Sequence, residues 1–480
     1  MSITIVGLGP GDPDLLTLNA WRILENAQIV YFRTHRHPVI NSLPERVKIE
    51  SFDHLYESCA SFDEVYQRIV ECILQLGETQ DRIIYAVPGH PLIAETTCSE
   101  ILRRALQEKI EVEIIDGLSF IEPLCTALEI DPFPNTILVD ALELAASHVP
   151  LFPPSIPVII AQLYSRQVAS DVKLTLMSLY PDEHPVMLVH GAGNAAQKVI
   201  NLALYEIDRD EEIGITTSLY LPALKPSSSF EALQEVVAHL RAPDGCPWDK
   251  EQTHHSLSSD LLEETYEVIN AIDEEDPASM SEEFGDLLLV ILLHIQIASE
   301  LGEFSLPEVL QGINEKIVKR HPHVFGKLQI KDVNGVLQNW ERFKAKERAA
   351  KGKIDSSALD GVTRTLPALI QAEQFQQRAS RVGFEWPDIT MVLGKVEEEL
   401  LEVKDTIGEE QASEIGDLIF AIVNLARWLK VDPESALRTA NLRFRKQFTF
   451  IEASARELGR QVSELTIDEM LAFWNAAKKT

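Results

Sequence analysis

An internal repeat in the second half of the chain constrains the fold more than any other feature. The pentapeptide EETYE at Glu263–Glu267 is echoed by EELLE at Glu398–Glu402. The longer segment EFGDLLLVILLH at Glu283–His294 is echoed by EIGDLIFAIVNL at Glu414–Leu425. Because the segments recur in the same order and at similar spacing, a chance match is a poor explanation. The pattern predicts two copies of one helical unit.

The residues before about position 222 follow a different pattern. Short apolar runs that end near Gly or Pro, such as ITIVGLGPG, RIIYAVPGHP, VEIIDG, IPVIIAQ and PVMLVHGAG, alternate with helical stretches. We expect helices over Leu15–Asn26, Phe62–Leu76 and Ala94–Gln107. This alternation is typical of an α/β domain with a largely parallel sheet, and it is consistent with two halves that meet near Asp116–Pro123.

Two polar segments predict the domain boundaries. The stretch LPALKPSSSF at Leu221–Phe230 is rich in Pro and Ser, and AKGKIDSSALDG at Ala350–Gly361 is a second candidate linker. After Phe230 only helical patterns remain. We therefore predict a multidomain chain: an α/β domain at residues 1–222, an all-α helical-bundle unit at 223–350 and a second one at 356–480.

Composition narrows the classes of partner. The formal net charge is −32, which disfavours binding to nucleic acid or to an anionic membrane surface. No uninterrupted apolar run reaches the roughly 18 residues of a membrane span, and the first residues do not resemble a signal peptide. Five scattered cysteines without a CxxC pair favour a reduced compartment. We expect a cytoplasmic protein.

The repeat places carboxylates beside apolar stripes. Residues three apart share a helix face, so Glu264 and Glu267 are neighbours, as are Glu283 and Asp286. A short connection between two helices makes them antiparallel, which gathers the four groups. Oxygen ligands of this kind suit Mg²⁺ or Mn²⁺, and Glu263 would bind a second ion or orient a water. The alternative is a solvated acidic face with surface ion pairs.

A basic helix follows the first acidic pair. Lys316 and Arg320 are four residues apart and share a face, and Trp340 is followed by Lys344 at the same spacing. Metal ions held by carboxylates usually leave positions open for the phosphates of a substrate. The basic side chains would neutralise the negative charge that remains on those phosphates. The tryptophan ring would stack on a base. The alternative is that the basic helix balances the acidic one and that Trp340 is a core residue.

These motifs resemble the MazG family of nucleoside triphosphate pyrophosphohydrolases in its tandem form. The first copy carries GCPWDKEQTH, EETYE, EEFGD, KRHPHVF and NWERFKAKE, and the second carries GFEW, EEELLE, EIGD and the Trp474/Lys478 pair. The resemblance implies all-α bundles that often form through dimers, so we expect a homodimer. It implies Mg²⁺-dependent cleavage of nucleoside triphosphates between the α- and β-phosphates, and a role in removing noncanonical nucleotides is consistent with the family.

The resemblance also implies roles by position. The metal ligands would be Glu264, Glu267, Glu283, Asp286, Glu399, Glu402, Glu414 and Asp417. The substrate contacts would be Lys316, Arg320, Trp340, Lys344, Arg443, Trp474 and Lys478. Glu263 or Glu264, and in the second copy Glu398 or Glu399, would position or activate the attacking water.

The second copy departs from the family pattern at two positions. Gln447 stands where the first copy has Arg320, and Glu410 stands four residues before Glu414, at a position that is often basic in active copies. We therefore expect the second copy to bind a triphosphate weakly even if it binds metal. Which of the two copies is active stays open at this point.

The first domain resembles the tetrapyrrole (corrin/porphyrin) methylases through VGLGPGDPDLLTL at Val6–Leu18 and YAVPGHPLIAE at Tyr85–Glu95. The resemblance implies S-adenosylmethionine as a ligand, held by Gly9, Pro10, Gly11, Asp12, Pro88, Gly89 and His90. Many catalytic members have Asp where this chain has His90. Two alternatives to the hydrolase follow: a methyltransferase with an accessory helical half, or an N-terminal domain that is a non-catalytic regulatory scaffold.

Overall fold

The computed structural model describes residues 2–59, 61–330, 357–408 and 410–478, together with a few positions between 332 and 343. The chain divides into two compact units, Met1–Glu251 and Gln252–Thr480. Helices α8 (Phe230–Arg241) and α9 (Pro247–Glu251) therefore group with the first unit, although the predicted boundary lies near residue 222. The predicted division of the helical part at residues 350–356 stays a prediction.

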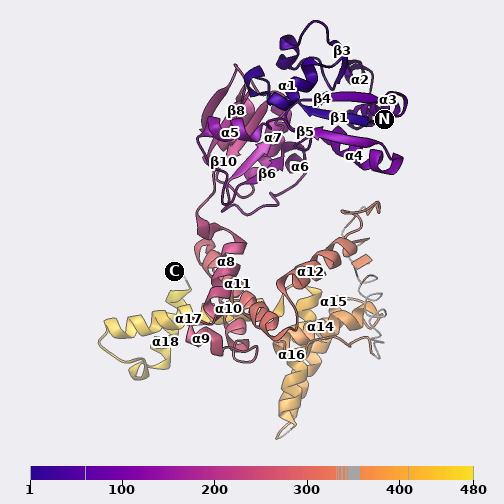
Figure 1. Cartoon of the computed structure of the whole chain (residues 1–480). Helices are drawn as coiled ribbons and strands as arrows, with labels where there is room; N and C mark the ends of the chain where they lie inside the picture. The colour runs from indigo at the N-terminus through magenta and orange to yellow at the C-terminus, as the bar shows by residue number, and fades with distance from the viewer. Residues whose placement is uncertain are drawn as a thin grey trace. The chain divides into compact units, whose positions relative to one another are not determined.

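The first unit begins with a five-stranded sheet in which every pairing is parallel, in the order β3-β2-β4-β1-β5 (Figure 1). Its strands are β1 (Ser2–Gly7), β2 (Ile29–Phe32), β3 (Lys48–Ser51), β4 (Arg82–Val87) and β5 (Glu111–Ile115). Its helices are α1 (Leu18–Glu25), α2 (Asp53–Ser58), α3 (Phe62–Thr79) and α4 (Thr96–Glu108). Helices α1, α3 and α4 lie close to the predicted ranges, and α2 was not predicted.

Both faces of this sheet are covered. Alternate residues of β4 enter different cores: Ile83 and Tyr85 pack with α3 and α4, whereas Ile84 packs on the side of α1. Successive side chains of a strand point to opposite faces, and a sheet buried on both faces has continuous apolar strands. The run RIIYAV in the sequence is of this kind.

The second sheet of this unit is mixed, in the order β6-β7-β10-β8-β9. Its elements are β6 (Ile137–Asp140), β7 (Val158–Ala161), β8 (Pro185–His190), β9 (Lys198–Ala203) and β10 (Thr217–Leu221), with α5 (Ile121–Leu128), α6 (Ala141–Ala145) and α7 (Arg166–Leu176). Only β6 and β7 pair in parallel. The expected largely parallel sheet is thus wrong here, because the turn at residues 191–197 joins β8 directly to β9 and forces an antiparallel pair.

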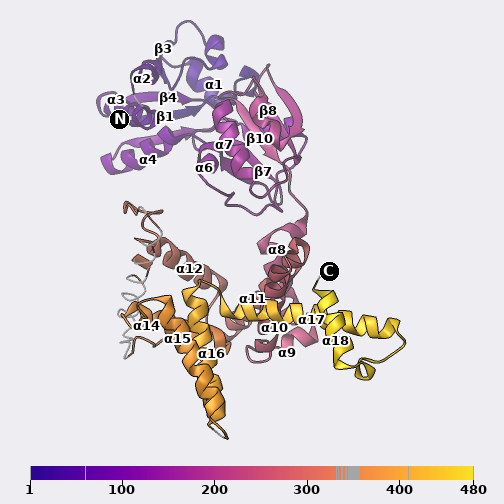
Figure 2. The ribbon, with the colours of Figure 1, turned by 180° about the vertical axis from the view of Figure 1, so that it is seen from behind.

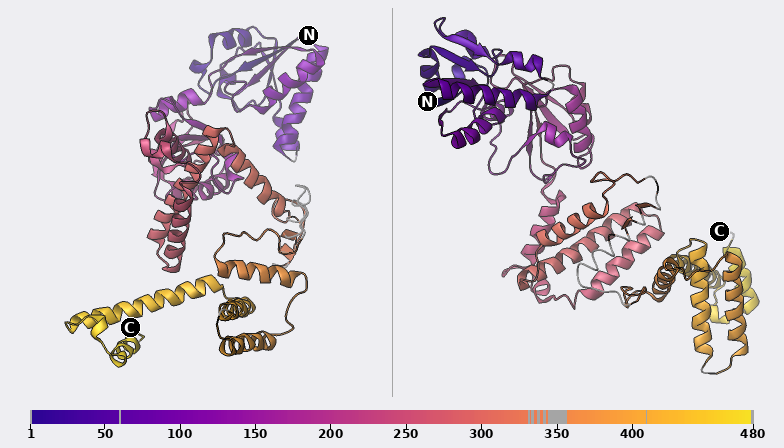
Figure 3. Two further views of the ribbon diagram at one scale, coloured as in Figure 1. Left: turned by 90° about the horizontal axis from the view of Figure 1, so that it is seen from below. Right: turned by 90° about the vertical axis from the view of Figure 1, so that its right-hand side faces the viewer.

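The second unit is helical and is built around two hairpins, α10–α11 and α15–α16, that carry the two copies of the repeat (Figures 2 and 3). Its helices are α10 (Ser258–Asp273), α11 (Pro277–Leu301), α12 (Leu306–Arg320), α14 (Ala368–Arg381), α15 (Ile389–Asp405), α16 (Gln411–Trp428), α17 (Pro433–Glu457) and α18 (Ile467–Ala477). Short 3-10 helices lie at Pro13–Leu15, Pro38–Ser42, Leu204–Arg209, Pro226–Ser228 and Val462–Glu464. The predicted fold class, an α/β domain followed by a helical part, is confirmed.

The first predicted linker joins the last strand to α8. Strand β10 ends at Leu221, a 3-10 turn begins at Pro226, and the Ser229 hydroxyl accepts a hydrogen bond from the Ala232 amide as the N-cap of α8. Of the second predicted linker, residues 350–356 lie outside the described part of the chain.

Helix α11 is long and apolar enough, by length and composition, to cross a membrane. The core helix of a soluble protein passes the same test, so the finding is weak evidence. The expectation of no membrane partner is neither confirmed nor contradicted.

Candidate functional site

Helices α10 and α11 form the hairpin that carries the first acidic group. Asp276 caps α11 by accepting a hydrogen bond of 3.0 Å from the Ala278 amide, and Pro277 occupies the first helical turn, where proline is tolerated. The predicted apolar stripe is buried, with Val268 on α10 and Val290 on α11 each only 6% exposed. This packing fixes the side of the hairpin on which the carboxylates lie.

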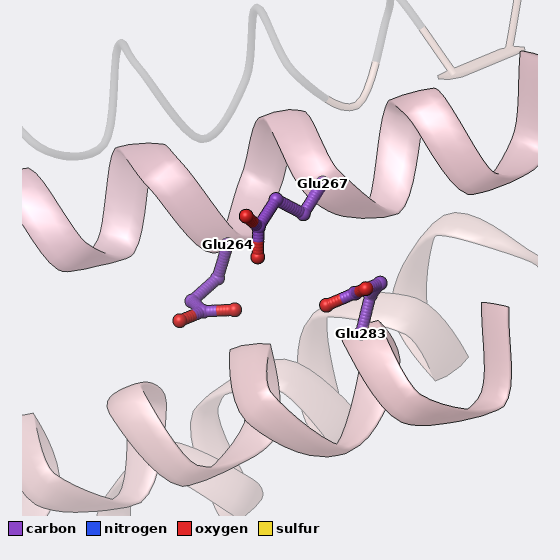
Figure 4. A group of neighbouring side chains, drawn as sticks. All are labelled: Glu264, Glu267 and Glu283. Atoms are coloured by element: carbon purple, nitrogen blue, oxygen red, sulfur yellow. The ribbon is translucent and has the colours of Figure 1, made fainter. Parts of the chain in front are cut away.

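Three carboxylates meet between the two helices. Glu264 and Glu267 extend from α10 and Glu283 from α11, and each offers an oxygen within 4.8 Å of the others (Figure 4). We call these three residues the first cluster. The Oε2 atom of Glu264 is buried without a hydrogen-bond partner. A buried, unpaired carboxylate oxygen is unfavourable unless a cation or a proton satisfies it.

The surroundings of the first cluster are acidic. Burial, and after it the charge of Asp286, raises the pKa of Glu264. Burial also raises the pKa of Glu283, and a hydrogen bond with the Glu267 carboxyl adds to the effect. All the neighbours that shift these two groups are themselves acids. The donor set of oxygen atoms fits a hard divalent cation such as Mg²⁺ or Mn²⁺, which would replace the proton that the acids otherwise compete for.

The second hairpin gathers a similar group. Glu399 on α15 and Glu414 and Asp417 on α16 offer oxygens within 4.8 Å of one another, and we call them the second cluster. Glu402 lies outside this set of three, as Asp286 does in the first copy. Burial, followed by the charge of Glu399, raises the pKa of Glu402.

A lysine, whose role here was not predicted, lies beside the second cluster. The Lys395 Nζ atom lies 2.7 Å from Glu399 Oε1 and 2.8 Å from Glu398 Oε1. The sequence signal was present, because Lys395 and Glu399 are four residues apart on one helix. Glu398, predicted to act on water, thus forms an ion pair with Lys395, and both Glu398 and Glu263 are exposed.

The predicted substrate residues of the first copy are partly brought together. The Arg320 guanidinium lies over the Trp340 ring at 5.4 Å, and the His321 ring meets the same ring edge-on at 5.1 Å. Lys316 is exposed on α12, and the described residues include no ion-pair partner for it. Lys344 lies outside the described residues. Among the described residues, no hydrogen bond or ion pair connects Lys316 or Arg320 with the carboxylates of the first cluster.

In the second copy the tryptophan is a packing residue. Trp474 contacts the Phe444 ring at 5.4 Å and packs against Ile451 and Ala455 of α17. Arg443 and Lys478 are exposed, and Gln447 is buried at 7% exposure. Trp474 is therefore part of an apolar cluster of α17 and α18.

A pair of histidines was also missed. The Nδ1 atoms of His254 and His294 are 2.8 Å apart, and the two rings are stacked with an interplanar angle of 4°. Their Nε2 atoms are buried without a hydrogen-bond partner, and His254 Nε2 lies 3.6 Å from a carboxylate oxygen of Glu303. The residues are 40 positions apart, so local sequence spacing carried no signal for this contact.

The two glycine loops of the first unit lie at the carboxyl ends of β1 and β4. The Gly9 amide donates to the Gly89 carbonyl at 3.2 Å, and the Gly89 amide donates to the Gly9 carbonyl at 2.8 Å. Both have positive φ, of 74° and 67°, which glycine adopts without strain. A side chain on Gly7 would begin 2.6 Å from the Gly117 amide nitrogen. These glycines allow the loops to pack closely.

The polar residues of these loops have local partners. The Leu92 amide donates to His90 Nδ1 at 3.1 Å, and His90 Nε2 lies 3.4 Å from an Asp116 carboxylate oxygen. Asp12 accepts a hydrogen bond of 3.0 Å from the Asp14 amide. His90 therefore takes a structural role that a short acidic side chain also fills, namely to accept from the backbone two residues on.

Two family models match the chain. The model of the tetrapyrrole (corrin/porphyrin) methylases matches residues 2–208, and that of the MazG nucleotide pyrophosphohydrolase domain matches residues 252–325. The nucleoside triphosphate pyrophosphohydrolase/pyrophosphatase MazG of Thermotoga maritima is 45% identical over 251 residues, a match that covers 52% of this chain and 95% of that protein. The chain belongs to the MazG family.

Further relatives cover either one half or all of this MazG-family chain. The nucleoside triphosphate pyrophosphohydrolase of Escherichia coli K12 is 39% identical over 259 residues, 52% of this chain and 98% of that protein. The uncharacterized protein YabN of Bacillus subtilis is 41% identical over 488 residues, 100% of this chain and 98% of that protein. As a family member the chain is a hydrolase, and the predicted union of a methylase-like domain with a MazG domain is confirmed.

The MazG model covers one copy of the repeat. Residues 252–325 include the first cluster, Asp286 and the basic residues of α12, whereas the second cluster lies beyond the match. This difference parallels the structural one, in which Lys395 neutralises part of the second cluster.

Proposed function

We propose that the first cluster is the catalytic centre of a Mg²⁺-dependent hydrolase that cleaves nucleoside triphosphates between the α- and β-phosphates, giving a nucleoside monophosphate and pyrophosphate. One observation carries the proposal. Three carboxylates from α10 and α11 offer oxygens within 4.8 Å of one another, inside the residues that the MazG model matches. The relatives from T. maritima and E. coli, which are named for pyrophosphohydrolysis of these substrates, support it.

The carboxylates of the first copy have separate roles in the proposed reaction. Glu264, Glu267 and Glu283 would hold the divalent ion, with Asp286 beside them. The ion supplies charge neutralisation and Lewis acidity to the phosphates. Glu263 or Glu264, at the edge of the ion, would orient the attacking water and accept its proton.

The cations of α12 would act on the leaving group. Lys316 and Arg320 would stabilise the negative charge that develops on pyrophosphate. Trp340, which already packs beside the Arg320 guanidinium, would stack on the base. Stacking tolerates every base, so this contact by itself sets no base preference.

Glu267→Gln tests the proposal, because it removes a ligand charge while keeping the shape of the side chain. We expect pyrophosphate release from a panel of NTPs and dNTPs to fall by about 100-fold or more, as when a key electrostatic group is lost. The matched control is Glu274→Gln, the same change at an exposed residue two helical turns further along, at the end of α10. We expect the control to retain full turnover.

Two outcomes would count against the assignment. Unchanged turnover in Glu267→Gln, with loss in Glu402→Gln, would move the activity to the second copy. Equal losses in Glu267→Gln and Glu274→Gln would show that charge removal on α10 acts through the fold rather than through a metal site.

We further propose a cytoplasmic homodimer that removes noncanonical nucleotides and binds no nucleic acid. Large apolar side chains on the second hairpin, among them Leu401 and Ile419, are about half exposed, as at surfaces that another chain covers. The charge of −32 argues against nucleic acid. Sedimentation velocity tests the assembly, since a single species of 53.8 kDa would contradict the dimer.

For the first unit we propose S-adenosylmethionine as ligand. The match to the methylase model and the close glycine loops at Gly9 and Gly89 support it, because backbone without side chains lets a ligand approach. Isothermal calorimetry with S-adenosylmethionine on the full chain tests this proposal. Absence of a binding isotherm would favour the regulatory-scaffold alternative over the methyltransferase one.

A further inference from the structure

Two histidines outside the carboxylate clusters meet where the chain enters the first hairpin. His254 lies in the segment at residues 252–257, which leads into α10, and His294 lies on α11. Their Nδ1 atoms are 2.8 Å apart, whereas the centroids of the two parallel rings are 5.1 Å apart. The rings therefore meet through their Nδ1 edges, at a distance within the range of a hydrogen bond.

This contact admits a limited number of protons. A neutral imidazole carries one N–H and one lone pair, whereas a protonated ring carries an N–H on both nitrogens. The hydrogen bond forms when one Nδ1 donates to the other, which is possible for two neutral rings and also for a pair with one additional proton. Two protonated rings would place two N–H groups and two positive charges against each other, and this breaks the contact.

The surroundings favour the first additional proton and oppose the second. The His254 Nε2 atom lies 3.6 Å from a carboxylate oxygen of Glu303, just beyond the end of α11, so a protonated His254 faces a negative charge. Burial, and after it the charge of His254, lowers the pKa of His294, while the Leu257 backbone acts in the opposite direction. Among the described residues, no acid of α10, α11 or α12 contributes to that shift.

We propose that His254 and His294 form a pH-sensitive clasp, which fixes the entry segment 252–257 on α11 while at most one additional proton is bound and releases it when both rings are protonated. The two compact units of the chain divide between Glu251 and Gln252. The clasp thus ties the chain to α11 directly after this division. The inference does not depend on the proposed function, because it involves no metal ion and no substrate.

The entry segment keeps other contacts when the histidines separate. The Thr253 amide donates to the Ser256 hydroxyl at 2.9 Å, and the Ser256 amide donates to the Thr253 hydroxyl at 3.1 Å. Leu257 is only 3% exposed, and α10 begins at the next residue. Acid should therefore loosen the entry to α10 without unfolding the hairpin.

Hydrogen exchange of a peptide covering residues 252–257, measured on the full chain in EDTA between pH 8 and pH 5, tests the proposal. EDTA removes metal ions that imidazole would otherwise bind. After correction for the intrinsic pH dependence of exchange, protection should be constant above the ordinary histidine pKa of 6.5 and should fall by about tenfold or more by pH 5. The sign follows because the released segment binds more protons than the clasped one.

Three variants separate the clasp from a general effect of acid. His254→Gln and His294→Gln each remove one titrating ring, and both should abolish the fall in protection, whatever their protection at pH 8. His255→Gln is the matched control, because His255 is exposed and adjacent in sequence, and it should keep the pH dependence of the wild type. An equal fall in the wild type and in both clasp variants would overturn the proposal, as would wild-type protection that is the same at pH 5 and pH 8.

Discussion

Glu264 and Glu283 make the stability of the helical unit depend on pH and metal together. Burial and the neighbouring carboxylates raise the pKa of both groups above the ordinary value of 4.5. The folded chain therefore holds these protons more tightly than the unfolded chain does. The corresponding stabilisation is fully present below the unfolded-state pKa. It is lost as pH rises through the folded-state pKa, because the acids must then ionise beside one another.

We therefore predict that chelation of metal lowers the unfolding temperature of the helical unit more at pH 8 than at pH 5. Mg²⁺ should reverse the loss at pH 8, because the ion binds only the ionised folded site. Calorimetric scans with EDTA and with MgCl₂ at the two pH values measure the effect. In Glu264→Gln the difference between the two scans should shrink, and an unchanged difference would exclude the first cluster as its origin.

The carboxylates of the site could be predicted, whereas their partners could not. Periodicity places Glu264 and Glu267 on one face whatever the tertiary structure, so their proximity follows from helix geometry alone. The His254–His294 contact requires a loop to fold back on α11, which no local pattern reports. The spacing of Lys395 and Glu399, four residues apart on one helix, could be recognised in the sequence. Such an (i, i+4) pair on a surface helix is common, however, and does not by itself indicate a function.

At the scale of elements, two glycines have opposite roles. Gly7 ends β1 where three chain segments converge, and an added Cβ would lie 2.6 Å from the Gly117 nitrogen and 2.7 Å from the Gly89 oxygen. Gly312 lies within α12, where an added Cβ would meet nothing within 4 Å. Backbone atoms cannot move aside as the end of a flexible side chain can.

We predict that Gly7→Ala destabilises the first unit by about 1–3 kcal/mol, the usual cost of overpacking. Gly312→Ala should stabilise α12 by about 0.5–1 kcal/mol, because alanine loses less backbone entropy in a helix. Hydrogen exchange of peptides from each unit measures the local opening free energies. A Gly7→Ala variant as protected as the wild type would contradict the close approach of the loops.

The direction of the strands was the part of the fold that sequence patterns missed. Helices α3 and α4 separate consecutive strands of the first sheet, and such crossovers produce parallel pairs. Strands β8 and β9 are instead joined by a turn at residues 191–197. Apolar runs predict burial on both faces in either case, so only the connection reveals the direction.

At the scale of the whole molecule, the chain joins a methylase-like α/β domain to the helical half of a MazG-family hydrolase. The B. subtilis relative matches along 98% of its length, so the union is shared by more than one protein. Two hairpins of the helical unit each gather carboxylates that suit a divalent ion. The central claim is that one of them, the first cluster, hydrolyses triphosphates.

Phosphorus-31 NMR of the reaction products tests that claim most directly. The full chain is incubated with a panel of NTPs and dNTPs and MgCl₂, and parallel samples contain EDTA. We predict nucleoside monophosphate and pyrophosphate in equal amounts with Mg²⁺, and no hydrolysis with EDTA or in Glu267→Gln. Release of nucleoside diphosphate and inorganic phosphate, or intact triphosphate in every sample, would contradict the account.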